Sequence, residues 1–164
     1  MYSKLFLFCA LSTTLFTVSC KKESIVENKF VVENQKVSGP MTLTQTSFTP
    51  LTFDSNGKPT TAKAVQNFSG TISTIGALTT VINVTLDLVT GRSGDVFATY
   101  VDKDGDKINT RSSSVTSTTG LTITEGITSG TGKFAKISGG GSYFVALNFQ
   151  TGNGTGTFEW TVTY

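Results

Sequence analysis

The stretch TVINVTLDLV, residues 80–89, alternates apolar and mostly polar side chains along its whole length. One parity consists of large aliphatic residues: Ile82, Val84, Leu86 and Leu88. The other parity consists of Val81, Asn83, Thr85 and Asp87. TFEWTVTY, residues 157–164, repeats the pattern with Phe, Trp, Val and Tyr on one parity and Thr and Glu on the other. A period of two is that of a β-strand with one packed face and one solvated face.

From Met41 onward, Thr, Ser, Gly, Val, Ile and Phe dominate, and Gly, Asn and Asp separate the alternating segments. This composition predicts an all-β domain over residues 41–164. The strands we expect are 41–48, 66–74, 78–89, 95–101, 107–112, 115–125, 142–150 and 156–164. Strands of this kind can close into an eight-stranded antiparallel up-and-down barrel, which leaves no unpaired edge. The alternative is a two-sheet β-sandwich, because it has the same periodicity.

Three blocks carry a resemblance that favours the barrel. They are FATYVDKDGDKI (97–108), GLTITEGITSGTGKFAKISGGGSYF (120–144) and GNGTGTFEWTVTY (152–164). Their order resembles exported bacterial proteins of the allene oxide cyclase and dirigent superfamily. That resemblance implies an eight-stranded antiparallel barrel with a central cavity. It implies no particular activity, since one fold hosts many functions.

Two turn motifs lie within these blocks. In SGTGKFAKISGGG, Phe134 and Ile137 are three apart, which predicts a single helical turn that closes one barrel end. The motif lacks the spacing of a phosphate-binding P-loop. In DKDGD, the Asp104-Gly105 pair predicts the tip of a hairpin. A calcium site formed by Asp102, Asp104 and Asp106 is the alternative. We expect no metal or cofactor.

The N-terminus predicts export and a lipid anchor. Lys4 precedes the apolar run at residues 5–18, which is too short to span a bilayer and is typical of a signal peptide. TVSC resembles a bacterial lipobox, which implies cleavage after residue 19 and acylation of Cys20 with chains such as palmitate. The alternative is an ordinary secretory signal that leaves Cys20 as a thiol. Two or three acyl chains anchor a protein stably.

The charged and amide-rich residues 21–40 are expected to form a flexible tether after the lipidated Cys20. An edge strand at KFVVE is the alternative. In Gram-negative lipoproteins, an aspartate directly after the acylated cysteine often marks retention in the inner membrane. Residue 21 is a lysine instead. The expected location is therefore the outer membrane, on its periplasmic face or at the cell surface. Cleavage removes Lys4 from the 13 basic residues and leaves 12, against 11 acidic residues. This balance indicates no nucleic-acid partner.

Candidate site residues are few. The chain has no histidine, which excludes Ser-His and Cys-His nucleophile systems. Glu125 shares its parity with Leu121 and Ile123, so a regular strand points it inward, where burial would raise its pKa. The alternative is a bulge at Gly126 that turns Glu125 to solvent. Glu159 becomes a second ligand-binding candidate if the polar side of the last strand faces the interior.

Three functions are compatible with these features. The first is a non-enzymatic outer-membrane lipoprotein scaffold whose interior is filled by side chains. The second is a binding barrel for a small apolar or amphipathic ligand. The third, a cyclase or isomerase, has the least support because no catalytic residue can be assigned. A cavity of roughly 300 Å³ or more would separate a ligand site from a filled interior.

Replacing Cys20 with Ala tests the anchor. We expect unprocessed precursor or released protein, because the acyl acceptor is lost. Membrane fractionation and the intact mass of the mature protein measure both outcomes. An unchanged membrane fraction together with an unmodified Cys20 in the natural protein would contradict the lipobox assignment.

Overall fold

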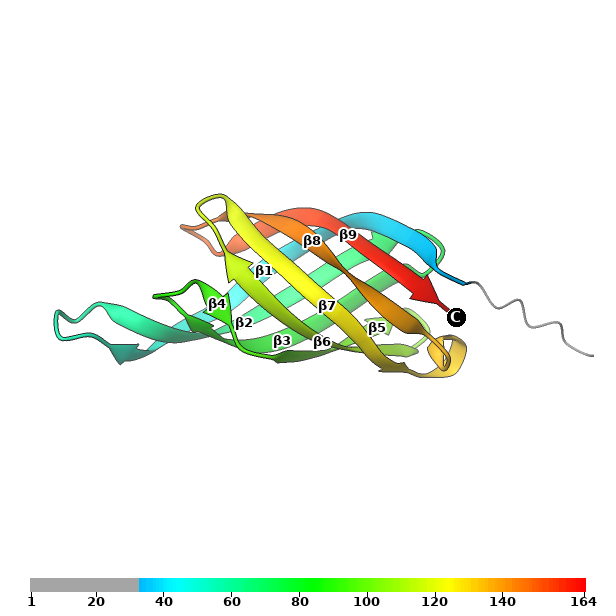
Figure 1. The fold of residues 1–164 in the computed structure, drawn as a ribbon, viewed down its shortest axis with the longest axis horizontal. Coiled ribbons are helices and arrows are strands. Elements are labelled where there is room, and N and C mark those ends of the chain that lie inside the picture. The colour runs from blue at the N-terminus through cyan, green and yellow to red at the C-terminus, as the bar shows by residue number, and fades with distance from the viewer. Residues whose placement is uncertain (1–32) are drawn as a thin grey trace, which may run out of the picture.

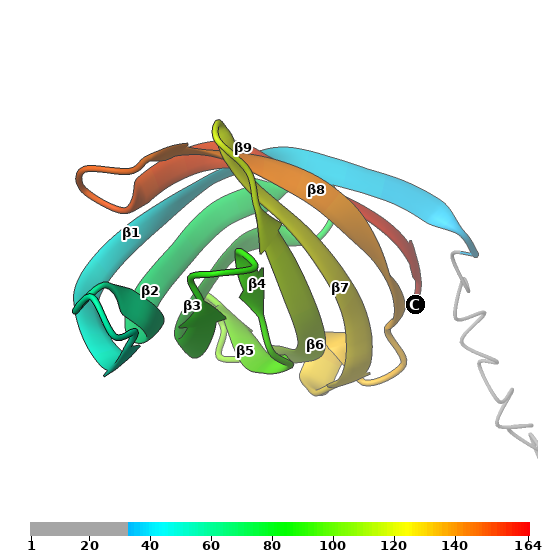
Figure 2. The same cartoon turned by 60° about the vertical axis from the view of Figure 1, so that its left-hand side comes forward.

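The computed structural model describes residues 33–164, which form a barrel of antiparallel strands (Figures 1 and 2). The strands are β1 (Gln35–Phe53), β2 (Pro59–Ile72), β3 (Gly76–Asp87), β4 (Arg92–Ser93), β5 (Val96–Asp102), β6 (Lys107–Thr116), β7 (Gly120–Gly130), β8 (Ser138–Asn148) and β9 (Asn153–Thr163). One short helical turn, η1 (Gly132–Phe134), lies between β7 and β8. Across residues 33–164, no helix has the length and apolar character needed to cross a membrane.

Strand β1 closes the ring because it pairs with β9 on one side and β2 on the other. The β9 ladder runs from Gln35↔Val162 to Leu43↔Gly154, and the β2 ladder begins at Met41↔Gly70. Eight long strands make the wall, and the two-residue β4 is an additional strand between β3 and β6. The prediction of an eight-stranded antiparallel barrel is therefore confirmed over the sandwich. Each expected strand corresponds to one long strand, whereas β4 was not predicted.

The start of the barrel differs from the prediction. Strand β1 begins at Gln35, so residues 35–40, expected in the tether, belong to the wall. The reason is packing: Val37 is only 2% exposed and lies opposite Trp160 in the β1–β9 register. Charged and polar residues flank Val37, so the alternation typical of a strand is not evident in the sequence there. Of the rest of the expected tether, residues 33 and 34 precede β1, and residues 20–32 lie outside the described residues.

Strands β3 and β5 pair with each other at one end only. Leu78 and Thr79 pair with Asp102 and Val101, and the far end of β3 pairs with β4 instead. No ladder pair joins residues 80–85 to residues 96–100 in the described structure. The inward faces of both segments line the interior, so this seam borders the space described below.

One end of the barrel is closed by η1 and the residues after it. Phe134 and Ile137 are 3% and 5% exposed and join the hydrophobic core, while Lys133 stays exposed and forms an ion pair with Asp102. The single helical turn expected there is confirmed.

The hairpin at the β5–β6 turn is confirmed as well, with Gly105 at φ +87°. Asp102 Oδ1 accepts the backbone N–H groups of Asp104 (2.8 Å) and Asp106 (2.9 Å), so the carboxylate stabilises the turn. Within residues 33–164, no cluster of three or more acidic, His or Cys side chains could hold a metal ion.

Replacing Gly141 with Ala should destabilise the barrel, because a Cβ there would lie 1.7 Å from the carbonyl oxygen of Glu159 on β9. We expect a loss of about 1–3 kcal/mol in the free energy of unfolding. The matched control is Gly126→Ala on β7, where the nearest atom to the new Cβ is 4.0 Å away. The control should change stability by no more than about 0.5 kcal/mol. Denaturant melts measure both variants, and equal losses would contradict the close approach of β8 and β9.

Candidate ligand-binding cavity

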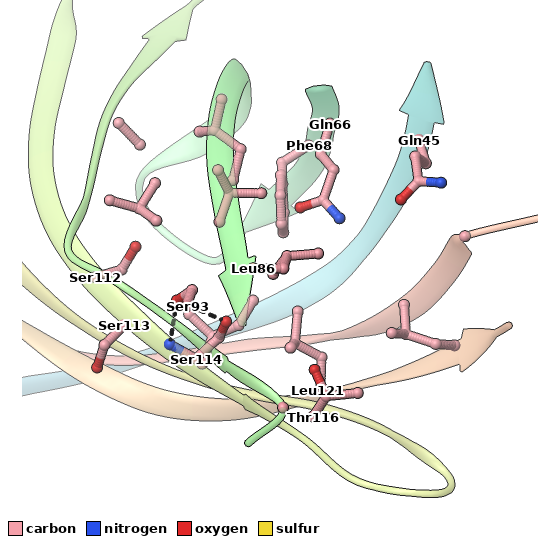
Figure 3. A pocket seen from close by; sticks show the side chains of 18 of the residues that line it. Gln45, Gln66, Phe68, Leu86, Ser93, Ser112, Ser113, Ser114, Thr116 and Leu121 are labelled. Carbon is pink, nitrogen blue, oxygen red and sulfur yellow. Dashed lines mark hydrogen bonds between the residues drawn. The ribbon is translucent and has the colours of Figure 1, made fainter. Parts of the chain in front are cut away.

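A cavity of about 480 Å³ lies inside the barrel. Most of its wall comes from inward-facing apolar side chains of strands β2, β3, β5, β7 and β8. These are Phe68, Ile82, Val84, Leu86, Val96, Ala98, Leu121, Ile123 and Leu147. Figure 3 shows Gln66, Phe68 and Leu86 extending into the same space. The aliphatic parity of residues 80–89 thus lines the cavity, because alternate side chains of a strand share one face.

The cavity opens at the end opposite η1. Its lining includes residues of the turns between β3 and β4 and between β8 and β9, and Thr116 at the end of β6, which lie together at one end of the barrel (Figure 1). Phe48, Leu88 and Phe149 form an apolar part of this mouth and are 44%, 38% and 55% exposed. Strand β4 borders the mouth, where Ser93 Oγ accepts hydrogen bonds from the N–H (2.8 Å) and hydroxyl (2.9 Å) of Ser114 (Figure 3).

Glu125 lies in the wall of this cavity and is only 4% exposed. Strand β7 is regular there: Glu125 pairs with Ser112 on β6 and with Gly141 on β8. The register shift between β6 and β7 falls at Asn109/Thr110, beyond Gly126 along β7. Glu125 therefore keeps the inward parity of Leu121 and Ile123, and no bulge at Gly126 turns it to solvent.

Three hydroxyl groups from three different strands donate to the Glu125 carboxyl. Thr110 on β6 donates to Oε1 at 2.6 Å, and Tyr143 on β8 donates to Oε2 at 2.9 Å. Tyr100 on β5 also donates to Oε2, at a longer 3.4 Å. The carboxyl thus ties together β5, β6, β7 and β8 at a single point.

Aromatic packing fixes the two tyrosine rings. Tyr100 makes edge-to-face contacts with Phe158 (5.8 Å between ring centroids) and Trp160 (5.6 Å), and Tyr143 makes one with Phe158 (5.2 Å). Such pairs contribute about 0.5–1.5 kcal/mol beyond their buried area. Both hydroxyls are therefore presented to Glu125 by rings that have little freedom to turn away.

Burial is the main influence on the Glu125 pKa and raises it above its usual range. The hydrogen bonds from Thr110, Tyr143 and Tyr100 act in the opposite direction because they stabilise the ionised form. The indole N–H of Trp160 is close enough to favour the ionised form too, although its geometry gives no hydrogen bond. Burial first, and then the nearby negative charge, raise the pKa of Tyr100 well above its usual range, so this tyrosine stays a neutral donor.

The structure places the other predicted residues differently. Glu159 is exposed on the outer face of β9 and does not line the cavity, which corrects its candidacy as a ligand-binding residue. That candidacy required a polar interior, whereas the interior face of β9 carries Phe158, Trp160 and Val162, all buried. Cys20 lies outside the described residues, so its lipidation stays a prediction.

Sequence reasoning missed three residues that line the cavity, namely Gln66, Tyr100 and Tyr143. Gln66 is 7% exposed, and its amide makes no side-chain hydrogen bond to another described residue. Its parity with Phe68 and Ile72 could have identified it as inward-facing. The tyrosines share parity with Ala98 and Val145 in the same way, but their meeting at Glu125 depends on contacts between distant strands.

No protein-family model, curated protein or solved structure matches this chain. The interpretation of the cavity therefore rests on its own geometry.

The stability of the barrel should depend on the ionisation of Glu125. Because its folded-state pKa is raised, its contribution to stability is fully present below the unfolded-state pKa and is lost as pH rises through the folded-state pKa. The difference in free energy of unfolding between wild type and Glu125→Gln should therefore shift in favour of the variant from about pH 4 to about pH 8. Each unit of pKa elevation corresponds to about 1.4 kcal/mol.

Taking the difference between the two proteins removes the opposite effect of carboxyls such as Asp87 and Asp102, whose pKa values are lowered. Urea melts across the pH range provide the measurement. A difference that does not change with pH would mean that Glu125 has an ordinary pKa and is solvated.

Proposed function

We propose that this barrel binds a small, largely apolar molecule in its central cavity. Glu125, together with Tyr100 and Tyr143, would hold the polar end of that molecule. The observation that carries the proposal is the cavity itself, whose volume of about 480 Å³ falls within the range of roughly 300–1,000 Å³ typical of ligand sites. A scaffold with a filled interior would not leave this volume. Glu125, Tyr100 and Tyr143 converge on one point of a wall that is otherwise mostly apolar, and a few placed polar groups in an apolar wall are the usual composition of a small-molecule site.

The energetic cost of Glu125 supports the same conclusion. A carboxyl placed among Leu121, Ile123 and the aromatic cluster loses its hydration, which destabilises the ionised form. An aliphatic residue of similar size would avoid that cost. A ligand that interacts with the carboxyl gives a reason for its presence. We propose binding rather than catalysis, because the lining hydroxyls that contact Glu125 belong to Tyr100 and Tyr143, whose raised pKa values keep them neutral donors rather than nucleophiles.

We also propose that the protein is a lipoprotein anchored through Cys20 to the outer membrane. The lipobox-like TVSC supports this, as does the tether-like composition that follows it. The described chain enters the barrel at β1, at the same end as η1 and Tyr164, whereas the mouth lies at the other end (Figure 1). An anchor on the N-terminal side thus attaches at the barrel end remote from the mouth.

The resemblance to the allene oxide cyclase and dirigent superfamily stays a proposal as well. It is supported by an eight-stranded antiparallel barrel with a cavity at its centre, both of which that superfamily implies. No catalytic residue of that superfamily is carried over to this chain.

Native mass spectrometry of the protein purified from its own membrane tests binding. We expect an additional mass that is lost on denaturation. Ala98→Leu should lower the retained fraction about tenfold or more, because Ala98 is 6% exposed and its new side chain would occupy the cavity. The matched control is Ala146→Leu on β8, which is exposed on the outer face and should retain the wild-type fraction.

Equal retention in both leucine variants would place the ligand outside the cavity. No retained mass, together with no binding of any added apolar probe, would favour the scaffold over the binding barrel. Thermal melts of both variants confirm that each is folded.

A further inference from the structure

The charge of the cavity lining is of one sign. Asp87 at the mouth and Glu125 in the interior are its acidic members, and no Lys or Arg belongs to the described lining. The ion pairs of the described residues join Lys103 to Asp104, Arg111 to Asp95, and Lys133 to Asp102 and Asp104. Glu125 takes part in none of them. An ionised Glu125 is thus stabilised by hydroxyl donors but is not neutralised by any Lys or Arg of residues 33–164.

Aromatic rings lie beside the same carboxyl. Tyr100 and Tyr143 line the cavity and contact Glu125, and Phe158 and Trp160 pack directly behind the tyrosines. The faces of aromatic rings attract cations, and a carboxylate beside them adds a full opposite charge. Anions, by contrast, would meet a like charge in a wall of low polarity, where screening by water is weak.

We propose that the cavity ligand is an amphipathic amine whose protonated nitrogen pairs with Glu125 and whose hydrocarbon body lies against the aliphatic wall. This inference rests on the proposed binding function and specifies its ligand class. Gln66 is on β2, which lies four strands from β7 in the closed ring, so its unpartnered amide faces the cavity from the opposite wall. It provides a neutral hydrogen-bonding group for a second polar atom of the ligand.

The pH dependence of binding follows from the groups around Glu125. The facing groups are Tyr100 on β5 and Tyr143 on β8, both neutral hydroxyls, together with the non-titrating Thr110 on β6 and Trp160 on β9. Asp87 at the mouth is ionised, since hydrogen bonds from Thr90 lower its pKa. Amine binding should therefore strengthen as pH rises through the elevated pKa of Glu125, while the binding of a neutral analogue stays level.

Three probes of equal chain length separate the ligand classes: dodecylamine, dodecanol and dodecanoate. The whole chain, freed of retained ligand, is titrated at neutral pH below the aggregation concentration of each probe. Fluorescence of Trp160, the only tryptophan in the chain, reports binding because its ring contacts Tyr100 beside Glu125. We expect the amine to bind about tenfold or more tighter than the alcohol, and the carboxylate to bind most weakly.

Two variants complete the test. Glu125→Gln should remove the advantage of the amine over the alcohol while leaving alcohol binding close to wild type. Glu159→Gln is the matched control, because Glu159 is an exposed glutamate on the outer face, and it should preserve the full preference. If Glu125→Gln does not fold, the pH dependence of wild-type amine binding relative to alcohol binding decides instead.

Equal affinities for the three probes would overturn the amine inference and leave the binding function intact, as would a preference for the carboxylate. Failure of all three probes to bind would contradict both the inference and the binding function. An amine preference that persists in Glu125→Gln would place the cation elsewhere and overturn the pairing with Glu125.

Discussion

The buried carboxyl of Glu125 is the constraint on which the interior of this barrel depends. Removing a carboxylate from water is costly, and the cost is tolerable only where donors are already in place. Thr110, Tyr143 and Tyr100 supply those donors from β6, β8 and β5. Strands β5, β6, β7 and β8 are consecutive neighbours in the wall, so inward side chains of β5, β6 and β8 can reach the carboxyl on β7. The aromatic cluster of Phe158 and Trp160 then holds the tyrosine rings in place.

The two ends of the barrel have different roles because different residues fill them. At the η1 end, Phe134 and Ile137 occupy the core, and Lys133 pairs with Asp102 across the turn. Large apolar side chains there leave no room for a ligand. Toward the other end, Ala98 and the seam between β3 and β5 leave space, and the mouth carries exposed apolar residues such as Phe149. The result is a barrel whose cavity has its mouth at the end opposite η1 and the Glu125 carboxyl inside, an arrangement suited to an amphipathic ligand.

The sequence predicted the features that depend on the local period of two, namely the strands and the inward position of Glu125. It did not predict the contacts between residues that are far apart in the chain. Alternation in residues 80–89 and 157–164 was sufficient to predict strands with one buried face and one solvated face. The parity of Glu125 with Ile123 was sufficient to predict that Glu125 points inward. Parity could not show that Tyr100 and Tyr143, 43 positions apart in the chain, meet at that carboxyl. Glu159 was misjudged because its candidacy assumed a polar interior, although the buried Trp160 and Phe158 beside it show that the apolar face is inside. The start of β1 was missed because Val37 lies among charged and polar residues, and its burial depends on β9.

Glu125 is a desolvated carboxyl inside the cavity, and no Lys or Arg of residues 33–164 pairs with it. An NMR titration of its side-chain carboxyl carbon, assigned by loss of the signal in Glu125→Gln, tests this claim most directly. In the ligand-free protein, Glu125 should have a pKa above the usual glutamate range, because burial outweighs the three hydroxyl donors. On addition of dodecylamine, the pKa should fall as the cation stabilises the charged form. A pKa within or below the usual glutamate range in the ligand-free protein, unchanged by the amine, would mean that Glu125 is solvated and does not pair with a bound cation.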